Sequence, residues 1–142
     1  MSNVVLFMHE GSLQMLIPAE NSNLSLQEII NKDIPDGCEH RIVDSSEIPL
    51  DRTFRDAWDL SLNVDMVKAR EIWASKIRVE RDRRLKELDV DWLRSFERGD
   101  DAEAGYVAVE KQKLRDLPVT ANLERFDNVD SLSNYWPEIL GG

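Results

Sequence analysis

The chain has 142 residues, of which 42% are hydrophobic and 32% are charged, and its formal net charge is −10. This length provides one ordinary domain, or one small domain with a helical extension, and the acidic excess disfavours broad binding to nucleic acid or anionic lipid. No apolar run reaches about 18 residues, so we expect no membrane span. The sequence contains a single cysteine and does not start like a signal peptide, so we expect a cytoplasmic protein.

The first predicted element is a β-hairpin. Residues 4–8 and 13–17 are short runs of branched and large apolar side chains, and the polar break between them contains Gly11. This arrangement is typical of two antiparallel strands joined by a tight turn.

A short helix and a third strand are expected next. Ser25 and Glu28 have the spacing of a capping box, in which the serine hydroxyl accepts a hydrogen bond from the Glu28 amide and the Glu28 carboxylate reaches back. The helix should run through Lys32, and residues 40–43 are the expected strand. Residues 1–64 are thus predicted to form a small acidic α+β head.

The segment 49–58 has a weaker pattern. Phe54, Ala57 and Trp58 fall at helical spacing, which indicates a helical turn. A connector that covers the base of the head is an equal alternative. We expect an ordered loop or a short helix here.

The longest predicted feature is an antiparallel helical hairpin over residues 65–118. Asp65 is placed to cap a first helix, whose apolar side chains recur at three-or-four spacing: Met66, Ala69, Trp73, Ile77, Leu85, Leu88, Trp92 and Phe96. Gly99 and Asp100 end this helix and begin a second one, with a narrower stripe of Ala104, Val107, Ala108, Lys111, Leu114 and Leu117. So short a connection favours an antiparallel return along the first helix.

Beyond Pro118 the apolar residues no longer recur at one regular spacing. Residues 119–142 are predicted to form a C-terminal segment with one short helix. The predicted fold is therefore α+β, with a head at 1–64 followed by a helical hairpin at 65–118. The head has 11 acidic and 4 basic residues, whereas residues 65–98 have 8 acidic and 10 basic ones. The long helix is the basic element of the chain.

No catalytic, cofactor or metal site is predicted. Neither His9 nor His40 belongs to a nucleophile motif, and a phosphate-binding glycine loop is missing. Cys38 and His40 would share one face of a strand, with His9 as an imaginable third ligand, but the paired spacing of zinc sites is missing. We expect a protein without enzyme activity, and an enzyme that uses these three residues is the alternative.

The candidate interface residues lie on the first helix. Residues 76–86 include six bases and two acids but no aromatic residue for base stacking, so a contact with protein is favoured over one with nucleic acid. Near the end of this helix, two aromatic residues have little of the head to pack against and are candidate hot spots. The candidates are Arg78, Arg81, Arg83, Arg84, Trp92 and Phe96.

Two parts of the sequence are motif-like. The helical part comprises Ile77-Arg78 with Arg81-Asp82, Leu85, Leu88-Asp89, the ending Gln112-Lys113-Leu114-Arg115-Asp116-Leu117-Pro118, and Trp136-Pro137. It resembles the phage tail-assembly chaperone family and related prophage proteins. The upstream part, residues 49–58 with Arg52, Phe54 and Trp58, is similar to a segment of small prophage tail-region proteins.

This resemblance implies a cytoplasmic helper without catalytic activity that binds a phage tail or tail-fibre protein during virion assembly. A minor structural component of the tail, associated with the virion, is one alternative. An acidic phage-encoded inhibitor of a host nucleic-acid-binding complex is another. Pairing of the basic helix with the acidic head of a second copy would give a homo-oligomer. No direct contact with nucleic acid or a membrane is expected.

Overall fold

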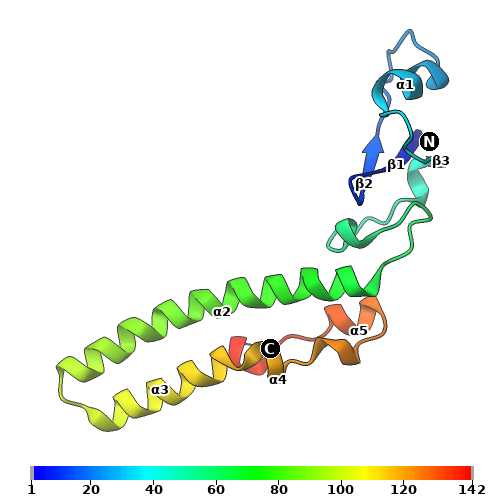
Figure 1. Ribbon diagram of the computed structural model, residues 1–142. Coiled ribbons are helices and arrows are strands. Elements are labelled where there is room, and N and C mark those ends of the chain that lie inside the picture. The colour runs from blue at the N-terminus through cyan, green and yellow to red at the C-terminus, as the bar shows by residue number, and fades with distance from the viewer. Residues whose placement is uncertain (1, 142) are drawn as a thin grey trace. The chain divides into compact units, whose positions relative to one another are not determined.

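The computed structural model describes residues 2–141. The chain divides into two compact units, Met1–Ala69 and Arg70–Gly142, which we call the N-terminal unit and the helical unit. A three-stranded antiparallel sheet near the N-terminus is followed by a long helix and several shorter ones (Figure 1). The predicted α+β fold is confirmed.

The sheet of the N-terminal unit has β1 at its centre. β1 (Asn3–His9) pairs antiparallel with β2 (Ser12–Leu16) on one side and with β3 (His40–Asp44) on the other. Glu10 and Gly11 join β1 to β2 with φ values of 51° and 79°. Two positive φ values in a two-residue loop match the twist of the flanking strands, and glycine accepts this conformation at little cost. Both the predicted hairpin and the predicted third strand are confirmed.

Both faces of β1 are covered, which explains its unbroken apolar run. Successive strand residues point to opposite faces. Val4 and Leu6 pack with Trp58 in one core cluster, whereas Val5 packs with Ile30 and its neighbours in another. The second cluster is built on α1 (Leu26–Asp33).

The start of α1 is the predicted capping box. The Glu28 amide donates to Ser25 Oγ, and the Ser25 amide donates to the Glu28 carboxylate, both at 3.2 Å. Two amides that the helix itself leaves unpaired are satisfied in this way.

The segment before the long helix is ordered by two short 3₁₀ turns, η1 (Ser45–Glu47) and η2 (Arg55–Ala57). Phe54, Ala57 and Trp58 are all buried. The expectation of an ordered loop or short helix is confirmed, because a single turn is enough to point these side chains inward.

The helical unit is built on a helical hairpin. α2 (Met66–Glu97) begins at the Asp65 cap, where the Val67 amide donates to Asp65 Oδ1 at 3.0 Å, and its first turn belongs to the N-terminal unit. α3 (Asp101–Arg115) begins where Asp100 Oδ1 accepts from the Glu103 amide at 3.1 Å. Figure 1 shows α3 running back alongside α2, as predicted.

The two helices meet through the predicted apolar stripes. Leu88 of α2 packs with Val107 and Leu114 of α3, and Leu85 and Trp92 border this cluster. The expectation was wrong for Ala108, which is exposed. Phe96 is exposed as well, in agreement with its place among the candidate interface residues. Each residue of a helix is rotated by about 100° from the next, so a side chain at the margin of a stripe turns away from the seam.

The C-terminal segment packs onto the hairpin within the helical unit. It contains α4 (Leu117–Thr120), η3 (Leu123–Arg125), α5 (Val129–Ser133) and η4 (Glu138–Leu140). The prediction of one short helix was therefore wrong, because Pro118 fits the first turn of a further helix instead of only ending the hairpin. The Trp73 indole nitrogen donates to the Tyr135 carbonyl at 3.0 Å, and the Trp73 and Trp136 rings meet edge to face at 5.9 Å. Ile139 and Leu140 border two core clusters at once. These contacts hold the segment against α2.

Candidate protein-binding site

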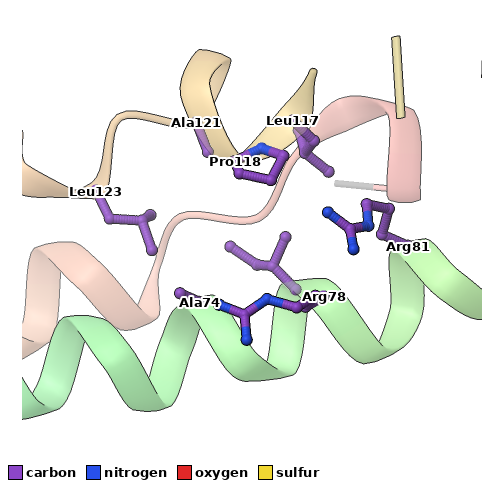
Figure 2. Close-up of a pocket in the computed structure, with 8 residues that line it drawn as sticks. Ala74, Arg78, Arg81, Leu117, Pro118, Ala121 and Leu123 are labelled. Atoms are coloured by element: carbon purple, nitrogen blue, oxygen red, sulfur yellow. The ribbon is translucent and has the colours of Figure 1, made fainter. Parts of the chain in front are cut away.

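A groove of about 200 Å³ lies between α2 and the chain that follows α3. Its floor is formed by Ile77 from α2 and by Leu117 and Ala121 from the other side, all at most 5% exposed. Figure 2 shows Ala74, Arg78 and Arg81 on α2, facing Leu117, Pro118, Ala121 and Leu123. We call these residues together with Ile77 the groove.

Local sequence explains the far wall of the groove. α3 ends at Arg115, and Pro118 lies in the first turn of the short helix α4, a place that suits proline because the first amides of a helix need no intrahelical acceptor. One turn of helix then places Leu117 and Ala121, four residues apart, on one face. Both pack against Ile77.

The groove combines an apolar floor with two cations. The Arg81 side chain is 18% exposed, and its Nε and Nη2 donate to Asp82 Oδ1 at 3.1 and 3.0 Å. Arg78 is exposed, and within residues 2–141 no hydrogen bond or ion pair involves its guanidinium. No acidic residue lines the groove in the part of the chain that the structure describes. The groove is thus locally basic on an acidic protein.

The other two candidate arginines have intrahelical partners. Arg83 pairs with Glu80 and Glu87, and Arg84 Nη1 lies 2.9 Å from Glu87 Oε2. The hydrogen bond from Arg83 lowers the pKa of Glu80, and the hydrogen bond from Arg84, with the charge of Arg83, lowers the pKa of Glu87. Such exposed pairs contribute little to stability, but they compensate the charges of both arginines.

The two candidate aromatic residues lie near the loop of the hairpin. Trp92 and Phe96 stack with ring centroids 5.3 Å apart, and Phe96 is 60% exposed. Trp92 is partly buried beside the α2–α3 seam, and Lys111 holds Asp89 at 2.6 Å while lying 5.9 Å from the Trp92 ring. The pair is therefore a stacked aromatic surface that Phe96 leaves partly open to solvent. In sequence, Trp92 follows the last groove residue of α2, Arg81, by about three helical turns.

The motif-like residues divide between core and surface. Leu114 and Leu117 are buried, Pro118 lines the groove, and Arg115 and Asp116 are exposed. In the N-terminal unit, Phe54 and Trp58 are core residues, whereas Arg52 is exposed. Sequence reasoning missed Ala74, Ala121 and Leu123 in the groove. The apolar residues Leu117 and Ala121, four apart on either side of Pro118, were the available signal for Ala121.

The polar side chains considered for metal binding come together only in part. Cys38 Sγ lies 3.7 Å from His9 Nδ1. Among the described residues, no group of three His, Cys, Asp or Glu side chains is arranged to hold a metal ion. None of the helices between residues 2 and 141 combines the length and apolarity needed to cross a bilayer.

No family model, no curated protein and no solved structure matches this chain. Its function is therefore inferred from the groove, the charges around it and the exposed side chains of the hairpin.

Proposed function

We propose that this protein is a helper without catalytic activity, similar in role to phage tail-assembly chaperones, and that its helical unit binds a tail or tail-fibre protein during virion assembly. The observation that supports this most is the composition of the groove. Ile77, Arg78 and Arg81 come from one resembling stretch, and Leu117 and Pro118 come from another, and all five line one hollow. Residues that share only a resemblance in sequence thus also share a surface.

The surface of the helical unit has the chemistry of a protein-binding face. Interfaces are anchored by aromatic and arginine side chains next to apolar area. The exposed large apolar residues of this unit are Val79, Val90, Leu93, Phe96, Tyr106, Val109 and Val119. Single exposed apolar residues are normal, but so many along two paired helices favour a partner that covers part of the hairpin.

Co-expression tests this function. The full chain is produced together with each tail and tail-fibre protein encoded beside its gene, and size-exclusion chromatography measures complex formation. We expect one of these proteins to co-elute with the chain and to gain soluble yield, while a protein of similar size and net charge gives neither effect. If none of these proteins forms a complex with the chain, the proposal is refuted.

The finished virion separates a chaperone from a tail component. A chaperone is released during assembly, so purified virions should contain no stoichiometric amount of the chain. Quantitative mass spectrometry of purified particles makes this measurement. Stoichiometric retention would instead assign the chain to the tail structure.

A further inference from the structure

The groove has the size to hold one large apolar side chain. A cavity of about 150 Å³ with apolar walls accommodates a benzene ring, and the groove holds about 200 Å³. Ile77, Leu117 and Ala121 close its floor, so most of the surface of an inserted side chain would lose its contact with water. A leucine or phenylalanine of a partner fits this space.

The charges at the groove favour a partner with carboxylates. Arg78 has no acidic partner among the described residues, and Arg81 uses two of its nitrogens on the neighbouring Asp82. A guanidinium binds a carboxylate through two parallel hydrogen bonds. The whole chain has a net charge of −10, so most of its surface would repel such a partner. The groove is therefore where an acidic segment is both attracted and oriented.

From this combination we infer that the groove binds an acidic segment of the partner protein that inserts one large apolar side chain and places carboxylates on Arg78 and Arg81. The inference rests on the proposed function, because it names the chemistry of the tail-protein segment that the helical unit binds. A nucleic acid is a poorer occupant, since the groove has no aromatic wall on which a base could stack.

Peptide titration of the isotope-labelled full chain tests the inference. The probe is a capped 12-residue peptide with one central leucine and glutamates on both sides. We expect shifts in the amide signals of residues 74–81 and 117–123. Affinity should fall about tenfold or more when serine replaces the leucine, and again when lysines replace the glutamates. A single-stranded oligonucleotide of the same length should give no such shifts.

Two groove variants with matched controls locate the binding. Ala74→Phe fills the groove, and Arg78→Glu reverses its open charge, so each should weaken the leucine peptide about tenfold or more. Ala102→Phe places the same ring on an exposed position of α3, and Lys76→Glu reverses a charge two residues away on α2. Lys76→Glu and Arg78→Glu each put a carboxylate four residues before another acid, Glu80 or Asp82, so this repulsion within the helix is the same in both variants. Neither control should change peptide affinity.

Several results would overturn the inference. They are the absence of shifts at about 2 mM peptide, equal binding of the lysine peptide, shifts centred on Phe96, or displacement by the oligonucleotide. The two proposals fail separately. If a tail protein forms a complex whose affinity Ala74→Phe and Arg78→Glu leave unchanged, the proposed function holds and the groove inference is wrong. If the acidic peptide binds the groove but no tail protein forms a complex, the groove does bind acidic segments and the proposed function is wrong.

Discussion

Truncation of Leu114 to alanine should destabilise the helical unit by about 3–5 kcal/mol, in the upper part of the range for buried leucine. Leu114 has an exposed fraction of 0% and packs with Leu88 and Val107, while Leu140 of the C-terminal segment borders the same cluster. The cavity would lie where two helices and this segment meet. Neither helix nor the C-terminal segment can move into the cavity without losing contacts with the other two elements. Little relaxation around the cavity is therefore expected.

Urea unfolding followed by far-UV circular dichroism measures this loss. For a urea dependence of about 1–3 kcal/mol per molar, the midpoint should fall by roughly 1–3 M or more. Val109→Ala is the matched control, because Val109 lies on the same helix and is 54% exposed. Its effect should stay within about 0.5 kcal/mol.

The outcome that would refute this packing is simple to state. If Leu114→Ala and Val109→Ala unfold at the same urea concentration with the same slope, Leu114 is not enclosed by α2, α3 and the C-terminal segment. The groove next to it would then lose its structural basis as well.

Three further predictions concern local interactions. Ser25→Ala should cost about 0.5–2 kcal/mol in urea unfolding, because the capping box loses its hydroxyl acceptor. Folding lowers the pKa of Glu80, so its pair with Arg83 stabilises the fold at pH values above the ordinary glutamate pKa. This stabilisation is lost as the pH falls through the lowered pKa. Arg83→Gln should therefore raise the pKa of Glu80, which an NMR titration measures. Arg81→Glu combined with Arg84→Glu should weaken association with a tail-protein partner about tenfold or more, with a nearly unchanged circular dichroism spectrum. Association that survives this double reversal in low salt would exclude α2 as the contact surface.

Local patterns allowed most secondary structure to be predicted. The capping box at Ser25, the Asp65 cap and the break at Gly99 each depend on hydrogen bonds or backbone angles within three or four residues. The hairpin of β1 and β2 likewise follows from two short apolar runs on either side of the turn at Glu10 and Gly11. Such signals are contained in a short stretch of sequence, so they need no knowledge of the rest of the chain.

The candidate site was predicted only by residue type. Four arginines of α2 looked equivalent, yet Arg83 and Arg84 pair with acids on their own helix whereas Arg78 and Arg81 line the groove. The difference depends on which side of α2 meets the segment after α3, which lies about 40 residues further along the chain. No periodicity of α2 alone contains that information.

By itself, the sequence determined most helices and strands of this protein up to the end of α3 and most of their apolar faces. Tertiary structure alone decided that Leu117, Ala121 and Leu123 return to α2 to form a groove, and that the C-terminal segment packs on the hairpin. The physical reason is the range of the interactions. Caps and turns act between neighbours, whereas a groove exists only once distant side chains have excluded water from a shared core.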